Sequence, residues 1–319
     1  MIKEISIQDF PKNIFIELPE EYRTTLFQLV FLESKNSLAI KLLLKEKGLR
    51  ENIFRWRRGH DRNLPQHINL KSLLYLFNKA KSKRGNIEIK VKLVENLLKN
   101  SENRINKTDA LISLIRDVRF IVMGSNNLSK ILGIHGRTLS SYVNNARIKK
   151  IPRFIIKNLI DFVYEKILCY EFTIGELQGK IISYKAYHGK SIQPYFNEKR
   201  KLPIRVTPEF ESIIYHLFGD GHVKEIGSGE YTQLSEGGRV NFLNKLYNSF
   251  GYFTITKKSF DDGRVIIPKA IIDIICSYYN LKYFNFNWNK SKLPLNISDD
   301  TEFKLAGLSA FIVDEGNIS

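Results

Sequence analysis

The sequence predicts an α+β protein in which a mostly helical N-terminal region precedes a smaller region that mixes helices with hairpins. Amphipathic helical patterns follow one another over residues 22–165, with apolar residues three and four positions apart. The pattern changes at residues 170–202, where glycines separate short β-rich runs. After residue 221, apolar and polar residues alternate on either side of glycine-containing turns.

These changes of pattern divide the chain into four parts. Residues 1–100 begin with a short β-like piece and continue as helices, and residues 101–169 form a second helical region. Residues 170–202 are a linker or a small β element that contains a basic run. Residues 203–319 form a further domain, whose first helix is expected to start at Thr207 as N-cap, followed by a first-turn proline.

The charge balance points to a polyanionic partner. The chain has 319 residues, with 50 Lys and Arg against 33 Asp and Glu, which gives a formal net charge of +17. An excess of this size, spread along the chain, favours nucleic acid over a membrane surface. No apolar run approaches the ~18 residues of a membrane-spanning helix, and no signal peptide is evident, so we expect a cytoplasmic protein. Cys169 and Cys276 lie in apolar helical patterns and are expected to be buried thiols.

Residues 127–147 have the spacing of a helix-turn-helix unit. The first helix is predicted at residues 127–134, the turn at 135–137 and the second helix at 138–147. The apolar residues expected to pack the two helices are Leu128, Ile131, Leu132, Ile134, Leu139 and Tyr142. The exposed side then carries arginine and short polar side chains, which contact base edges and phosphates in a major groove. These candidate DNA-binding residues are Arg137, Thr138, Ser140, Ser141, Asn144 and Asn145, followed in a basic loop by Arg147, Lys149 and Lys150. The alternative is a plain helical hairpin with a polar surface.

An earlier segment, residues 37–77, has a related order of helix, turn, helix and loop. Three positions align with the later unit within one residue of gap, namely Gly48 with Gly133, Trp56 with Tyr142 and Pro65 with Pro152. This indicates a weak internal repeat of helix-turn-helix units. The basic residues predicted to contact DNA here are Arg55, Arg57 and Arg58.

Two apolar segments of the C-terminal region end in the same way. Residues 210–223 and 303–318 each predict an apolar helix with one carboxylate, Asp220 or Glu315, just before a glycine. The glycine would end the helix in a left-handed conformation. The acid faces the negative end of the helix dipole, which is unfavourable by about 0.3–1 kcal/mol. One such acid is usually a solvated helix end, but two on packed helices would repel each other unless a divalent cation neutralised them.

The stretch between these two helices predicts two hairpins and two further helices. The first hairpin, residues 222–235, turns at residues 227–229, and the second, residues 252–267, turns at residues 261–263. Helices are expected at residues 240–250 and 270–279, and an aromatic, lysine-bearing loop follows them.

The two apolar segments resemble the motif of the LAGLIDADG (dodecapeptide) homing endonucleases. The motif stands as IIYHLFGDG at residues 213–221 and as LSAFIVDEG at residues 308–316, and LAGL occurs at residues 305–308. The first copy departs from the motif at Tyr215, where the family prefers a small residue. The resemblance covers residues 202–319 and implies an αββαββα-type domain whose two motif helices pack at its centre.

The resemblance also implies a catalytic site. In this family the motif acids hold Mg²⁺ for phosphodiester hydrolysis, and by position these acids are Asp220 and Glu315. A basic residue normally assists, and the sequence offers Lys257 or Lys258 for this role. The strands of the family form a saddle on DNA, so that Lys224, Gln233, Lys257, Lys258 and Arg264 would point at the duplex.

The sequence therefore predicts a site-specific, Mg²⁺-dependent endonuclease of double-stranded DNA, with helix-turn-helix units that lengthen the recognised site. The alternatives are a catalytically inactive DNA-binding regulator and an RNA-splicing maturase. The chain stops three residues after Gly316, so the second half of the domain is expected to be missing or incomplete. A fragment of a longer product is the first interpretation. A decayed endonuclease that still binds DNA, and a homodimer with Asp220 of both copies in the metal site, are the others.

Overall fold

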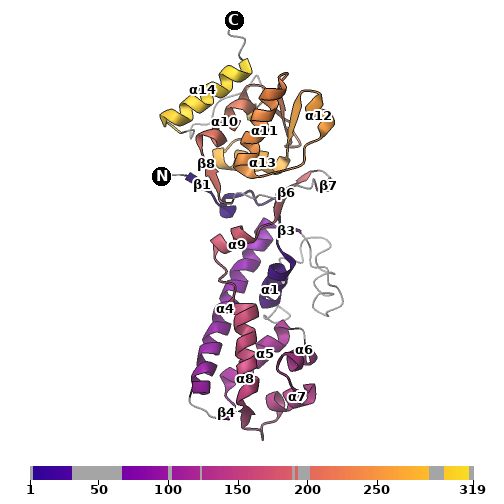
Figure 1. The fold of residues 1–319 in the computed structure, drawn as a ribbon, viewed down its shortest axis with the longest axis vertical. Coiled ribbons are helices and arrows are strands. Elements are labelled where there is room, and N and C mark those ends of the chain that lie inside the picture. Colours follow the sequence, from indigo (N-terminus) through magenta and orange to yellow (C-terminus); the bar gives the residue numbers. More distant parts are fainter. Residues whose placement is uncertain are drawn as a thin grey trace. The chain divides into compact units, whose positions relative to one another are not determined.

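The computed structural model of the chain describes residues 3–30, 67–99, 103–122, 124–188, 191–192, 202–286 and 298–315. These residues form an α+β fold, as the sequence predicts, with many helices and small antiparallel sheets (Figure 1). Most of the first predicted helix-turn-helix unit, including Arg55, Trp56, Arg57 and Arg58, lies outside the described residues.

The described residues divide into two compact units. Unit 1 comprises those within Met1–Leu18, His67–Lys71 and Leu177–Ser319, and unit 2 comprises those within Pro19–Gln66 and Ser72–Glu176. Unit 1 is thus built from three separate stretches of the chain, whereas the change of sequence pattern alone predicts a boundary near residue 203.

Unit 1 holds three antiparallel sheets and the helices of the C-terminal region. Its strands are β1 (Lys3–Ile5), β2 (Ile14–Glu17), β3 (His67–Asn69), β6 (Ser183–His188), β7 (Ser191–Ile192), β8 (Ile204–Val206), β9 (Gly221–Val223), β10 (Gly229–Thr232) and β11 (Arg264–Ile267). Its helices are α10 (Pro208–Phe218), α11 (Glu236–Phe250), α12 (Lys257–Asp261), α13 (Lys269–Tyr279) and α14 (Thr301–Glu315), with 3-10 turns at Ile7–Asp9 and Tyr283–Phe286. Helix α9 (Ile174–Lys180) spans the boundary between the units.

Residues near the N-terminus complete two of these sheets. Strand β2 lies between β3 and β6, with Ile16 opposite both Ile68 and Tyr184, and all three side chains are buried. Strand β1 pairs with β8, with Lys3 opposite Val206. Because antiparallel pairing can join segments that are remote in sequence, residues far ahead of position 203 share a core with the residues after it.

The third sheet has the strand order β11-β10-β9 and packs on α10 and α11. The hairpin predicted at residues 222–235 is present as β9 and β10, but the hairpin predicted at residues 252–267 is wrong. Only β11 forms there, and it pairs with β10, while the preceding residues form the short helix α12. The guanidinium of Arg239 lies 5.1 Å from the centre of the Phe260 ring in α12. Strand preference depends on tertiary context, which a local sequence pattern does not reveal.

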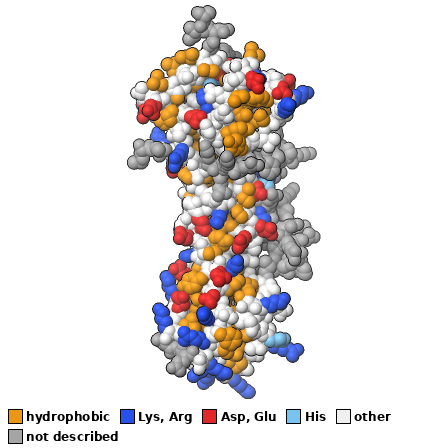
Figure 2. Space-filling model, in the orientation of Figure 1, with side chains coloured by type: hydrophobic (Ala, Val, Ile, Leu, Met, Phe, Trp, Pro, Cys, Tyr) orange, Lys and Arg blue, Asp and Glu red, His pale blue; other side chains and the backbone are white. Residues whose placement is uncertain are grey.

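In its described residues, unit 2 is helical apart from one two-stranded ladder. Its helices are α1 (Glu20–Val30), α4 (Leu70–Lys99, whose first two residues belong to unit 1), α5 (Asp109–Ile121), α6 (Ser125–Ile131), α7 (Gly136–Asn144) and α8 (Arg153–Val163), which continues as a π-helix (Tyr164–Leu168). The ladder is formed by β4 (Arg104–Asn106) and β5 (Lys150–Pro152). Figure 2 shows Lys and Arg side chains gathered at the end of unit 2 that carries β4 and α7.

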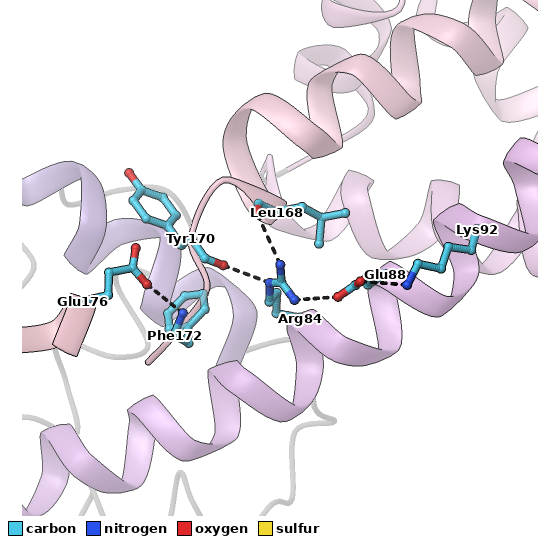
Figure 3. Close-up of polar contacts among 7 residues, drawn as sticks. All are labelled: Arg84, Glu88, Lys92, Leu168, Tyr170, Phe172 and Glu176. Carbon is cyan, nitrogen blue, oxygen red and sulfur yellow. Dashed lines mark hydrogen bonds and ion pairs between the residues drawn. The ribbon is translucent and has the colours of Figure 1, made fainter. Parts of the chain in front are cut away.

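An arginine of α4 secures the end of the π-helix (Figure 3). Arg84 donates through Nε to the carbonyl oxygen of Tyr170 at 2.9 Å and through Nη2 to that of Leu168 at 3.4 Å. Carbonyl groups at a helix C-terminus have no partner within the helix, so a cation that donates to them is favourable. Two residues further on, Phe172 has a left-handed φ of 54°, and Glu176 accepts its N–H at 2.7 Å. These contacts fasten the chain after α8 to α4.

Helix α4 has 30 residues but carries charged side chains along its length. No helix in the described part of the chain is both long enough and apolar enough to cross a membrane.

The two cysteines differ in exposure. Cys276 is buried in α13, whereas Cys169 is exposed, so the prediction that both are buried is wrong for Cys169. Cys169 follows Leu168, the last buried residue of the segment. Burial raises the pKa of the Cys276 thiol to about 12, so its reactive thiolate is scarce near neutral pH.

We therefore expect iodoacetamide at pH 8 to label Cys169 in the native chain, and Cys276 only after denaturation. Intact-mass measurement counts the labels, and a Cys169→Ser variant, as the control, should take up none in its native state. Native labelling of that variant would contradict the burial of Cys276.

Candidate functional site

Helix α10 is buried along almost its whole length. Thr207 caps it, as predicted, because its Oγ1 accepts the N–H of Phe210 at 3.1 Å, and Pro208 occupies the first turn. Every residue from Phe210 to Phe218 is buried. A helix that is buried all round, rather than along one stripe, contacts protein on every side.

Helix α14 packs against α10, and two glycines allow the close approach. A Cβ atom on Gly307 would lie 2.3 Å from the ring of Tyr215, and a Cβ atom on Gly219 would lie 2.9 Å from Oδ2 of Asp314. Neither glycine can carry a side chain unless its neighbour moves. The bulk of Tyr215 is thus accommodated by Gly307 on the facing helix.

The opposite face of α14 is apolar and exposed. Four large apolar side chains on it are between 46% and 60% exposed, namely Leu305, Leu308, Ile312 and Val313. Helix α14 therefore uses only one side for packing within the described residues.

A buried polar network joins α10 to α14. Nδ1 of His216 lies 2.9 Å from both carboxylate oxygens of Asp314, and the Tyr231 hydroxyl donates to Asp314 Oδ1 at 2.6 Å. Nζ of Lys245, in α11, lies 2.8 Å from His216 Nε2. While Lys245 is protonated it can only donate, so Nε2 accepts and Nδ1 carries the proton that faces Asp314. This assignment gives a neutral imidazole between a cation and an anion.

Burial shifts the acid–base properties of this network. The pKa of Tyr231 is raised far above its ordinary value, first by burial and then by the hydrogen bond to Asp314 and the charge of that carboxylate. The charge of Asp220 raises it slightly further. Burial lowers the pKa of Lys245, and the charge of Asp314 opposes this effect. Tyr231 therefore remains a neutral donor to Asp314.

Asp220 follows Gly219, the C-cap of α10, and is half-buried. Its backbone carbonyl accepts the N–H of Thr232, at the end of β10, at 3.1 Å. The expected left-handed conformation of Gly221 is wrong, because Gly221 begins β9 and has no positive φ. A glycine is required there for space, since a Cβ atom would lie 2.4 Å from the Cα of Leu217. The backbone of Asp220 is thus held between α10 and the sheet.

Helices α10 and α14 end side by side. Gly219 and Asp314 are in contact, and each is followed by one of the predicted metal-binding acids, Asp220 and Glu315. The side chain of Glu315 lies outside the described atoms. The packing therefore brings the backbone at these two positions to the same helix junction.

The donor chemistry at this junction fits magnesium. Mg²⁺ is commonly bound by one or two carboxylates together with waters and phosphate oxygens, and Asp220 and Glu315 offer that number of carboxylates. Asp314 is not a ligand candidate, because its side chain is 0% exposed and is bonded within the network. Among the described side chains, no three His, Cys, Asp or Glu gather in a way that could hold a metal ion.

The outer side of the β11-β10-β9 sheet is not uniformly basic. Lys224 and Arg264, both predicted to contact DNA, pair with Glu230 at 3.0 and 3.4 Å. Burial acts to raise the pKa of Glu230, but the hydrogen bond from Lys224 and the charges of both cations hold it below its ordinary value. Gln233 is half-buried just past β10, where its Oε1 accepts the N–H of Ser235 at 3.4 Å. Glu230, which the sequence analysis missed, thus neutralises part of this surface.

Lys257 and Lys258 do not lie on a strand. They are exposed and begin the short helix α12, so their predicted place on a saddle strand is wrong. The reason is the absence of the second hairpin described above.

The second predicted helix-turn-helix unit is present in unit 2 as α6 and α7, which pack together. His135 caps α7, because its Nδ1 accepts the N–H of Arg137 at 3.3 Å. Val143, rather than the predicted Tyr142, packs inward with Leu139, since these two residues lie four positions apart on one helix face. All nine candidate DNA-binding residues are at least partly exposed: Arg137, Thr138, Ser140, Ser141, Asn144, Asn145, Arg147, Lys149 and Lys150.

The polar network of His216, Tyr231, Lys245 and Asp314 is not predicted by the sequence pattern. One signal was available, because a histidine and an aspartate inside two otherwise apolar helices need buried partners. The signal does not say that they bond to each other, since that depends on how the helices cross.

Comparisons of the chain with protein-family models, with curated proteins and with solved structures find no match. Function must therefore be inferred from the residues themselves.

Proposed function

We propose that this chain is a Mg²⁺-dependent, site-specific endonuclease of the LAGLIDADG type that acts on double-stranded DNA. The main support is the junction of α10 and α14, where two packed helices end side by side and each has an acid followed by a glycine at its C-terminal end. Two carboxylates at the negative ends of neighbouring helices are unfavourable without a cation. The arrangement is thus easier to explain by metal binding than by stability alone.

The order of elements in unit 1 also supports the proposal. From α10 the chain continues through β9, β10, α11, β11 and α13, which resembles one half of an αββαββα domain with one strand replaced by α12. Helix α14 then takes the place of the second motif helix, packed against α10.

In the proposed site, Asp220 and Glu315 hold the cation at the helix junction. When bound there, Mg²⁺ would supply an activated water and stabilise the charge that develops on the phosphate. Asp220 is oriented by its place between α10 and β10. The contact of His216 with Asp314 holds α14, and with it the backbone of Glu315, against α10. Lys257 and Lys258, exposed on α12, are the proposed basic residues that assist at the phosphate.

Unit 2 would extend recognition of the substrate. Helix α7 has nine residues and an exposed side rich in short polar groups and arginine. We infer that it lies in the major groove as the second helix of a helix-turn-helix, with its N-terminal residues near base edges.

An Asp220→Asn variant should lose DNA cleavage by more than about 100-fold, because it removes a direct metal ligand, and even indirect metal partners are worth about 10–100-fold. The assay measures nicking and linearisation of a supercoiled plasmid that carries the DNA flanking the gene of this protein, with Mg²⁺. Asp261→Asn, the same change at an exposed acid of α12, is the matched control and should cleave like the wild type. Chelation of the metal should also abolish cleavage. Undiminished cleavage by Asp220→Asn would exclude this metal site.

The basic surface of unit 2 favours a second candidate, a DNA-binding protein that does not cleave, because that surface needs no metal. The plasmid assay separates the two candidates. Salt-sensitive binding by both the wild type and Asp220→Asn, with no cleavage by either, would support the second.

A further inference from the structure

One segment of unit 2 has cations and no acids. Between Asp117 and Asp161 the chain contains eight Lys or Arg and no Asp or Glu. This segment forms α6, α7, β5 and most of α8. Helix α4, in contrast, mixes acids with its lysines, as where Lys92 lies 2.9 Å from Glu88. A long stretch of cations alone creates a positive field that attracts phosphate groups.

The ladder next to α7 presents cations on one face. Its register places Arg104 opposite Pro152, Ile105 opposite Ile151 and Asn106 opposite Lys150. The two isoleucines are fully buried. Because successive side chains of a strand point to opposite faces, Arg104 and Lys150 share the outer face, where both are exposed. Lys149, directly before β5, is exposed as well.

The ladder is fastened to the C-terminal end of α7. Nζ of Lys107, the residue after β4, donates to the carbonyl oxygens of Val143 and Asn145 at 3.4 and 3.1 Å. The N–H of Lys107 donates to the carbonyl oxygen of Lys149 at 2.8 Å. Lys107 thus bonds carbonyl groups that the helix leaves unpaired. The ladder and α7 are therefore held together as one surface.

Within the described residues, no acid neutralises the cations of this surface. In the part of the chain that the structure describes, Arg104, Lys149 and Lys150 form no salt bridge. Lys224 and Arg264 of unit 1, in contrast, both pair with Glu230. Figure 2 shows the Lys and Arg side chains at this end of unit 2.

We propose that the exposed cations of the β4–β5 ladder bind the phosphate backbone of duplex DNA, beside the groove that receives α7. The binding residues are Arg104, Lys149 and Lys150, and Lys107 is a positioning residue. The inference rests on the proposed DNA binding by α7. Phosphate contacts fix the register and orientation of a protein on DNA, while base contacts read the sequence.

The neighbouring helix favours DNA over duplex RNA as the partner. The major groove of B-DNA is about 12 Å wide and admits an α-helix, whereas the major groove of A-form RNA is deep and narrow. Cations alone would attract either duplex. The cations of the ladder are held beside α7, and an exposed polar helix fits the major groove of B-DNA but not that of A-form RNA.

The test is the salt dependence of DNA binding by the full-length chain in the presence of a chelator. Fluorescence anisotropy follows the binding of two labelled 30-base-pair duplexes of unrelated sequence. The triple variant Arg104→Gln/Lys149→Gln/Lys150→Gln should reduce the slope of log affinity against log salt by about 0.9 for each lost phosphate contact, hence by up to ~2.7. It should weaken binding of both sequences by the same factor, because phosphate contacts carry no sequence information.

The matched control removes three charges elsewhere in unit 2, in the variant Lys81→Gln/Lys92→Gln/Lys166→Gln. Its slope should stay close to that of the wild type, since charges farther than about 10 Å from the DNA are screened. The single variant Arg104→Gln should lower the slope by about 1 and guards against a folding defect in the triple variant.

A triple variant with the slope of the control would overturn the proposal, as would a wild-type chain that binds no duplex. The choice of DNA would be overturned if the wild type bound an RNA duplex of the same length as tightly and the triple variant lost that binding. The outcome is separable from cleavage. Suppose that the wild type never cleaves DNA but the triple variant has a reduced slope of log affinity against log salt. The proposed DNA binding by the ladder is then supported, and the endonuclease proposal fails.

Discussion

A His216→Leu variant should lose about 3–5 kcal/mol of unfolding free energy. The change leaves the Asp314 carboxylate, whose side chain is 0% exposed, with the Tyr231 hydroxyl as its remaining partner in the network. It also removes the acceptor that faces Lys245. Removing a hydrogen-bond partner of a buried carboxylate is costly, because the desolvation of that charge is then less well offset.

The double variant His216→Leu/Asp314→Val should regain part of that loss, because it removes the buried Asp314 carboxylate, while Lys245 and Tyr231 still lack their acceptors. Equilibrium urea unfolding, followed by far-UV circular dichroism, measures both variants. His222→Leu, the same substitution at an exposed residue of β9, is the control and should stay within about 0.5 kcal/mol of the wild type. A double variant as unstable as His216→Leu would mean that the pair is not what stabilises this junction.

A Gly307→Ala variant should lose about 3 kcal/mol, near the upper end of the usual cost of overpacking. In an exposed helix the same change is favourable by about 0.5–1 kcal/mol, so the predicted effect has the opposite sign. The added methyl group would lie 2.3 Å from the ring of Tyr215. That ring cannot easily turn away, because it is buried and packs edge-on against Phe311 at 5.2 Å between centroids.

A double-mutant cycle with Tyr215→Ala tests the mechanism of this loss. Tyr215→Ala alone is destabilising because it leaves a cavity. In the Gly307→Ala chain, however, it also removes the ring that the added methyl group would meet. The double variant should therefore lose at least about 1 kcal/mol less than the sum of the two single losses. Gly179→Ala, in α9 where a Cβ atom would meet nothing within 4 Å, is the control and should not destabilise. Strictly additive losses of unfolding free energy would show that the Tyr215 ring is not the reason why Gly307→Ala is destabilising.

The parts of the fold that local chemistry determines could be predicted from the sequence. The α+β class, the Thr207 cap, and the order of α6 and α7 all follow from spacing and from N-cap chemistry. The second hairpin could not be predicted correctly, because strand preference depends on tertiary contacts such as that of Arg239 with Phe260, which a local pattern does not contain.

The site was predictable only in outline. The paired helix ends are visible as repeated acid–glycine sequences, but their packing depends on Tyr215 meeting Gly307, which breaks the expected pattern of small residues on α10. Asp314 and Glu315 are adjacent acids, and only the crossing of the helices shows that Asp314 is the one bonded to His216. Side-chain partners across elements are properties of the folded chain and are not encoded in any local spacing.

The discontinuous construction of unit 1 has a consequence for synthesis on the ribosome. Strands β1 and β2 are made well before their partners β8 and β6, which begin only at residues 204 and 183. Most of unit 2 is translated between these times, and its contacts are largely helical and local. It can therefore fold first, because local contacts form faster than remote strand pairs. Until translation passes residue 206, β1 lacks the strand with which it pairs, so this small sheet can close only after most of unit 2 has been made.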